Sequence, residues 1–159
     1  MPSRRSAVAA LVAVSALVAV APAGAAKPAR EPLPAEGFVD DAGIICGFPI
    51  AIDIAQNKET LTTFPDGNFL ITGVFKATFT NVADPSRTIT VNASAASRTG
   101  ETSTGPQLYI LADPEEAFGA GIYLVRGKSA AVRDEEGRIV EVPLNGTVSG
   151  NLCDLIASP

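Results

Sequence analysis

Two clusters of carboxylates are the first residues in the chain that could carry out chemistry. One lies in segment 113–116 (DPEE) and the other in segment 134–136 (DEE). Pairs of carboxylates catalyse glycoside hydrolysis, and carboxylates together with carbonyl oxygens bind calcium. Both clusters fall in predicted connections between strands, and neither matches the calcium loop of the EF-hand. We therefore interpret them as solvated loops and predict no catalytic, cofactor-binding or metal-ligating residue.

Histidine is absent from the 159 residues, which excludes histidine-based catalysis and histidine metal ligands. A serine nucleophile would then need a lysine or a carboxylate as its base. Lys128 and Ser129 are adjacent, and on a strand neighbouring side chains point to opposite faces, so they cannot form that pair. The remaining enzymatic alternative is a carboxylate-dependent hydrolase in which Asp53 faces one of the loop carboxylates across a cleft.

The first 26 residues have the composition of a secretory signal peptide. Arg4 and Arg5 precede a run of Ala, Val and Leu, and small residues follow in an A-x-A arrangement. The run is shorter than the roughly 20 residues of a transmembrane helix. We predict cleavage after Ala25 or Ala26, no membrane span after processing and a secreted, extracellular protein; the general and the twin-arginine export routes both remain open.

The chain that remains after cleavage is acidic. Without Arg4 and Arg5 it carries 10 basic and 17 acidic residues, a net charge of −7. This balance argues against nucleic-acid binding.

Cys46 and Cys153 are the two cysteines of the chain. In an oxidising compartment a lone pair of cysteines normally forms one disulfide. The bridge would join positions 107 residues apart. In the chain-entropy model a loop of that size contributes about 4–5 kcal/mol to the free energy of unfolding.

We divide the exported chain into a flexible lead-in rich in Pro and Ala at 27–43 and an all-β domain at 44–159. In residues 46–54 apolar side chains occupy every second position, which is typical of a half-buried strand. Pro49 within this run favours an edge strand. Residues 95–106 are rich in Ser, Thr and Gly and predict a loop.

Two hairpins can be aligned from their side chains. Residues 69–79 are predicted as one strand broken by Gly73, and pairing Phe79 with Ile89 aligns the apolar residues on one face and the threonines on the other. The last hairpin is predicted to turn at 135–137 and to pair Val132 with Val140 on its buried face. A final strand at 146–153 is expected to lie beside the first one.

Turn signals recur about every ten residues along the domain, which is typical of an all-β fold. The expected architecture is an antiparallel β-barrel or β-sandwich of about eight or nine short strands with one disulfide. The sequence does not separate the barrel from the sandwich.

Four runs of the chain carry a resemblance to known proteins: FPDGNFLITGVFKATFTNVADPSRTITVNASA, GPQLYILADP, GAGIYLVRGK and GTVSGNLCDLIA. Together they resemble uncharacterised small secreted two-cysteine β-proteins of high-GC Gram-positive bacteria, over about residues 44–157. That family has no assigned activity, so the resemblance implies a fold and the cysteine pair but no catalytic residue. The segment GAGIYLVRGKSAAVRDEEGRIV also resembles the closing hairpins of allene oxide cyclase and dirigent barrels.

The expected function is non-enzymatic binding outside the cell by a monomer. Its partner would be a component of the cell envelope, another protein or a small apolar ligand. A deep dry pocket would favour the small ligand, and a filled core would favour a protein partner. The alternatives are the carboxylate-dependent hydrolase and a structural protein of the envelope.

Overall fold

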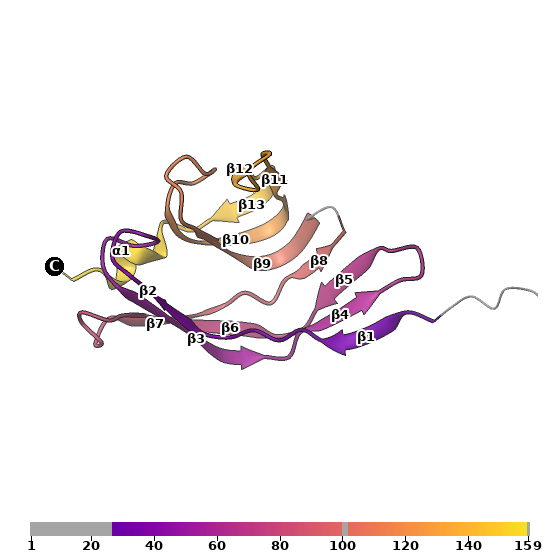
Figure 1. Ribbon diagram of the computed structural model, residues 1–159, viewed down its shortest axis with the longest axis horizontal. Coiled ribbons are helices and arrows are strands. Elements are labelled where there is room, and N and C mark those ends of the chain that lie inside the picture. Colours follow the sequence, from indigo (N-terminus) through magenta and orange to yellow (C-terminus); the bar gives the residue numbers. More distant parts are fainter. Residues whose placement is uncertain (1–26, 100–101, 159) are drawn as a thin grey trace, which may run out of the picture.

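The computed structural model describes residues 27–99 and 102–158, and the predicted signal peptide at 1–26 lies outside these residues. The described chain folds into antiparallel β-sheets with one short helix, which confirms the all-β prediction (Figure 1). Strands form because β-branched and aromatic residues alternate with polar ones over short runs bounded by Gly, Pro and Asp.

One sheet has four strands in the order β2-β3-β6-β7. These are β2 (Phe38–Asp40), β3 (Ile50–Asn57), β6 (Phe75–Asn81) and β7 (Thr88–Asn92). The predicted register of its β6–β7 hairpin is confirmed, since Phe79 pairs with Ile89 and Thr78 with Thr90. The hydroxyl oxygens of Thr78 and Thr90 are 2.8 Å apart on the outer face.

The second sheet has seven strands in the order β1-β4-β5-β8-β9-β10-β13. These are β1 (Ala29–Pro32), β4 (Thr60–Thr63), β5 (Phe69–Thr72), β8 (Ala96–Arg98), β9 (Thr102–Leu111), β10 (Gly121–Ala130) and β13 (Leu144–Val148). A small hairpin and a helix complete the fold: β11 (Val132–Arg133), β12 (Ile139–Glu141) and α1 (Leu152–Ile156).

The chain passes from one sheet to the other four times, and two of these crossings, between β3 and β4 and between β5 and β6, lie next to each other. Lys58, between β3 and β4, donates its backbone N–H to the carbonyl of Val74, between β5 and β6 (2.8 Å). Gly73 has a φ of 146°, and a Cβ at this position would collide with the carbonyl oxygen of Lys58. The prediction of one broken strand over 69–79 is therefore wrong, because the break at Gly73 sends β5 and β6 into different sheets.

Strands β9 and β10 are covered on both faces (Figure 1). On one face they pack against the four-stranded sheet and α1. We call this cluster the disulfide core: Ile45, Cys46, Ile50, Ile52, Ala77, Phe79, Val91, Ile122, Leu152, Cys153 and Ile156. On the other face they pack against the β11–β12 hairpin and the loop before β10. We call this cluster the hairpin core: Tyr109, Leu111, Tyr123, Val125 and Ile139.

The two sheets form an open sandwich, so the barrel alternative is wrong. Gly105, Gly127 and Gly146 lie side by side on β9, β10 and β13. A Cβ on Gly127 or Gly146 would collide with the backbone of the neighbouring strand. This row of glycines allows the seven-stranded sheet to bend sharply. The bend does not close the sheet, because β1 and β13 remain its two unjoined edges.

Two expectations for the start of the domain are corrected. The lead-in at 27–43 contains β1, which pairs with β4, and β2, which pairs with β3. Neither segment shows an alternation of apolar and polar residues, because both are short edge strands whose side chains are mostly exposed. Pro49 does not mark an edge, since β3 lies between β2 and β6. Pro49 comes just before the first paired residue and so removes no hydrogen bond from the ladder.

The Ser/Thr/Gly segment at 95–106 also contains strands, because β8 pairs with the start of β9. At the last hairpin the predicted turn is confirmed, with Gly137 at a φ of 85°. Its predicted pairing of Val132 with Val140 is wrong. Val132 pairs with Glu141, and a bulge leaves Ile139 buried and Val140 exposed.

Candidate functional site

The predicted disulfide between Cys46 and Cys153 is confirmed, with the two Cα atoms 5.6 Å apart and both side chains buried. Cys46 lies in the segment before β3 and Cys153 in α1, so the bridge ties the start of the domain to its end. The expected final strand at 146–153 does not lie beside the first strand, because β13 pairs with β10 in the other sheet. Its second half is also wrong, because Asn151 caps a helix instead. Its side-chain oxygen accepts from the backbone N–H of Cys153 (3.0 Å) and of Ile122 on β10 (3.1 Å).

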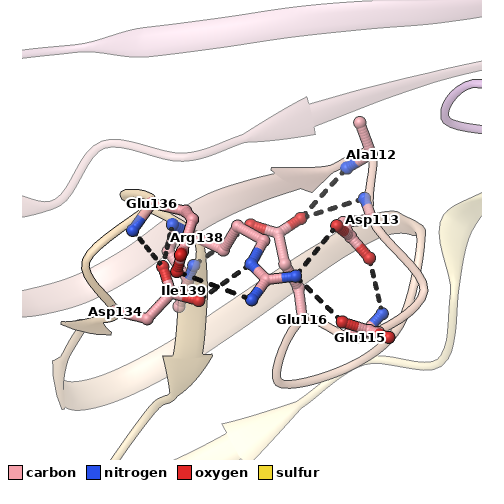
Figure 2. Close-up of polar contacts among 8 residues, drawn as sticks. All are labelled: Ala112, Asp113, Glu115, Glu116, Asp134, Glu136, Arg138 and Ile139. Carbon is pink, nitrogen blue, oxygen red and sulfur yellow. Dashed lines mark hydrogen bonds and ion pairs between the residues drawn. The ribbon is translucent and has the colours of Figure 1, made fainter.

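The two acidic clusters, far apart in sequence, meet around the guanidinium of Arg138 (Figure 2). Its Nη1 lies 2.9 Å from Glu115 and 3.5 Å from Asp113. Its Nε lies 2.8 Å from Asp134, and its Nη2 lies 3.7 Å from Glu136. The loop before β10 and the β11–β12 turn are thus held together by one cation and four carboxylates.

Glu116 joins the same two elements through backbone hydrogen bonds rather than through Arg138. Its Oε2 accepts from the N–H groups of Ala112 (3.1 Å) and Asp113 (3.2 Å), and its Oε1 accepts from Ile139 (3.1 Å). A carboxylate that accepts several backbone N–H bonds stabilises the loop that supplies them. Figure 2 shows the Glu116 carboxylate bonded to Ala112 and Asp113 at the start of the acidic loop.

Electrostatics at the cluster favour the ionised form of Asp134. Desolvation raises the pKa of Asp134, but the hydrogen bonds and the charge of Arg138 outweigh it, so this pKa lies below its ordinary value. Hydrogen bonding to Asp134 is likewise the main cause that raises the pKa of Arg138. A general acid needs the opposite shift, a raised carboxyl pKa. Asp134 therefore lacks the shift of a general acid, and the ion pairs of Arg138 link the loop and the turn structurally.

The structure does not bring the other proposed reactive residues together. Asp53 is exposed on the outer face of β3, paired with Thr78, a layer away from the acidic cluster (Figure 1). Ser129 is buried and donates to the side-chain oxygen of Gln107 (3.1 Å), whereas Lys128 is exposed. Among residues 27–99 and 102–158, no group of His, Cys, Asp or Glu has an arrangement that could hold a metal ion.

Several open grooves lie on the surface of the described residues. The groove that concerns us, here called the edge groove, has a volume of about 390 Å³ and lies between β7 and β13. Its two walls are 89–92 and 147–149, with Leu124, Arg126 and Leu152 between them. Arg126 is the one charged residue in this lining.

The sequence analysis missed the edge groove. A signal was present, because the segments TITVN of β7 and LNGTV of β13 contain neither a charged residue nor a proline. Edge strands of natural sheets usually carry such protective residues. The sequence alone does not reveal that both segments are edges, nor that the two edges face one groove.

Comparison of the chain with protein-family models, with curated proteins and with solved structures finds no significant match. Within the part of the chain that the structure describes, no helix is long and apolar enough to cross a membrane.

Proposed function

We propose that this protein is exported and acts outside the cell by binding a protein partner at the edge groove. The signal-peptide composition of residues 1–26 and the disulfide both support export, since disulfides persist in oxidising compartments. The single observation that carries the binding role is the edge groove, bordered by two strands that each have one neighbour in their sheet.

The packing of the domain favours a protein partner over a small apolar ligand. The disulfide core is filled by side chains such as Phe79, Ile50 and Ile122, which are fully buried. The hollows around it are open to solvent, whereas sites for small apolar ligands are concave and bury most of the ligand. An open groove of this kind suits an extended or flat partner.

The hydrolase alternative finds no support in the placement of its acids. Asp53 is isolated from the acidic loops, and Asp113, Glu115, Asp134 and Glu136 are all engaged with Arg138. No further observation favours a structural role in the envelope.

Two exposed valines offer a matched experiment. Val148 lies in the edge groove, and Val140 lies on the β11–β12 hairpin with a similar exposed fraction (37% and 42%). A photo-reactive amino acid is placed at one or the other position in the full chain, which is then expressed in the cell that produces it. We expect a cross-linked product of defined mass from Val148 and none from Val140, in the extracellular or envelope fraction.

Equal products from both valines, or none from either, would contradict the binding role. Mass spectrometry of the same fraction checks export independently, because the mature chain should begin at Ala26 or Lys27. A full-length chain retained inside the cell would overturn export.

A further inference from the structure

We propose that the edge groove accepts an extended peptide segment of a partner protein, which adds as a strand to β7 and places an acidic side chain against Arg126. This inference rests on the proposed function and specifies its partner. In this mode of recognition the backbone hydrogen bonds supply affinity, while pockets for alternate side chains supply specificity.

The four edges of the sandwich are protected unequally. Edge strand β1 contains Arg30, Glu31 and Pro32, and edge strand β2 has three residues, one of them Asp40. Strands β7 and β13 have five residues each, with no charge and no proline. Charge, proline and short length are usual defences against strand addition, and β1 and β2 have them whereas β7 and β13 lack all three.

The hydrogen-bond register shows which backbone groups of β7 face the groove. Ala93 donates to the carbonyl of Phe75, and Arg87 accepts from Asn81, both at 3.0 Å. Odd-numbered residues of β7 therefore bond to β6, because bonding alternates along an antiparallel edge. The N–H and C=O groups of Thr88, Thr90 and Asn92 point away from β6, toward the side where the edge groove lies.

The same reasoning applies to β1 and explains its proline. Leu33 donates to the carbonyl of Glu59 (3.1 Å), so Glu31 bonds to β4 while Arg30 and Pro32 face outward. Pro32 thus occupies an outward position, where it removes a donor that a foreign strand would use. Thr90 is the corresponding outward position on β7 and keeps its donor.

The groove also offers places for side chains. Leu124 and Leu152 are buried residues that contribute to its lining, next to the apolar Val91 of the β7 wall. Arg126, which is exposed, adds a single positive charge. An extended peptide that alternates apolar and polar residues, with one carboxylate among the polar ones, matches this pattern.

Charge also distinguishes a peptide of this kind from a second copy of the chain. The chain has a net charge of −5, and the part predicted to remain after export is more acidic. Two such domains repel each other because both carry a large negative charge. A peptide with a single carboxylate, placed beside Arg126, is repelled less.

The probe is a capped peptide of about seven residues, a typical strand length, of alternating Thr and Val with one central Glu. It is titrated into the mature, oxidised protein and followed by amide NMR and hydrogen exchange. We expect slower exchange at Thr88, Thr90 and Asn92. A probe with Lys in place of Glu should bind about tenfold more weakly, the loss expected for one charge-assisted contact.

Matched variants test each part of the proposal. Arg126→Ala should remove the preference for Glu over Lys, while Lys128→Ala, which removes an exposed cation of the same strand outside the groove lining, should leave it unchanged. Thr90→Pro removes an outward N–H of β7 and should abolish binding. Arg30→Pro removes the equivalent N–H of β1 and should not affect it.

Several results would overturn the proposal. These are no binding by any of the probes, binding without protection of the outward β7 amides, or protection caused by self-association at high protein concentration. If Thr90→Pro fails to fold, hydrogen exchange of the wild-type protein with the peptide still tests whether the outward amides of β7 are protected. Failure of the probe while Val148 still cross-links would reject strand addition but retain the binding role; failure of both would reject both.

Discussion

The two faces of the β9–β10 pair are stabilised in different ways. On the disulfide-core side, Ile122 meets aliphatic residues from both ends of the domain, and a covalent bond joins those ends. On the hairpin-core side, Tyr123 and Tyr109 pack around Phe118, with ring centroids 5.2 and 6.1 Å from it. The rim of that side is held by Arg138 and its carboxylates.

This difference shows how one strand can serve two cores. Residues 121–125 of β10 are all buried, with even-numbered and odd-numbered side chains on opposite faces. The sequence of a strand covered on both faces is a continuous run of apolar residues. The disulfide core draws its residues from distant parts of the sequence. The hairpin core instead packs β9 and β10 against a loop and a hairpin that adjoin β10 in the sequence. We expect the disulfide core to determine the free energy of unfolding of the whole domain. Changes in the hairpin core should affect only the loop and the hairpin that cover it.

The largest expected effect is loss of the disulfide. Reduction, or replacement of both cysteines by Ser, should lower the free energy of unfolding by up to about 4.7 kcal/mol, the chain-entropy value for a loop of this size. Urea unfolding of the oxidised and reduced protein measures the difference. An unchanged midpoint would show that the bridge does not stabilise the disulfide core.

Truncation of one phenylalanine in each core gives the next largest effect. Phe79→Ala in the disulfide core should cost about 4 kcal/mol, because Phe79 is fully buried and leaves a cavity. Phe118→Ala should cost less, since Phe118 is half-buried at the hairpin core. Chemical denaturation of the two variants compares the cores directly. Equal losses of unfolding free energy would show that the two cores contribute alike to stability.

Arg138→Gln should have a smaller and more local effect. It removes the cation shared by four carboxylates, which then repel one another across the loop and the turn. Amide exchange should accelerate in β11, β12 and residues 113–119 but not in β3 and β6. The matched control is Arg87→Gln, which removes a single exposed ion pair to Asp84. Faster exchange throughout the molecule would show that the two cores are coupled.

The smallest expected effect is a pH dependence of stability that arises at the β11–β12 hairpin. The folded-state pKa of Asp134 is lowered, so its contribution to stability is fully present above the unfolded pKa of about 3.9 and is lost as the pH falls through the lower folded value. Thermal unfolding between pH 7 and pH 2 of the wild type and of Asp134→Asn measures it. The variant should be less stable near neutral pH and lose less stability in acid. If stability falls with pH in the same way for both proteins, Asp134 does not contribute to the pH dependence.

The predictions made from sequence succeeded where the signal was local. The register of Phe79 with Ile89 followed from two strands joined by a short loop, whose faces agree in one alignment only. The register of β11 and β12 failed, because the backbone of Ile139 is bound by Glu116 and Ala117 from the loop before β10. Such a contact overrides a local alternation pattern and leaves no trace in the hairpin itself.

The candidate sites show the same limit. Both acidic clusters were recognised from sequence, but their joint use of Arg138 depends on two loops that are brought together only by the fold. The edge groove depends on two edges that belong to different sheets, and sheet membership was decided where the chain crosses from one sheet to the other, as it does at Lys58 and Gly73.

The sequence by itself determined the all-β class, most of the strands of the domain and the pairing of Cys46 with Cys153, because alternation, turn residues and a lone pair of cysteines are local or countable properties. The tertiary structure decided that the sheets form an open sandwich rather than a barrel. It also decided that β9 and β10 are buried on both faces and that two unprotected edges meet at one groove. These features depend on contacts between residues far apart in the chain, and such contacts leave no periodicity in the sequence.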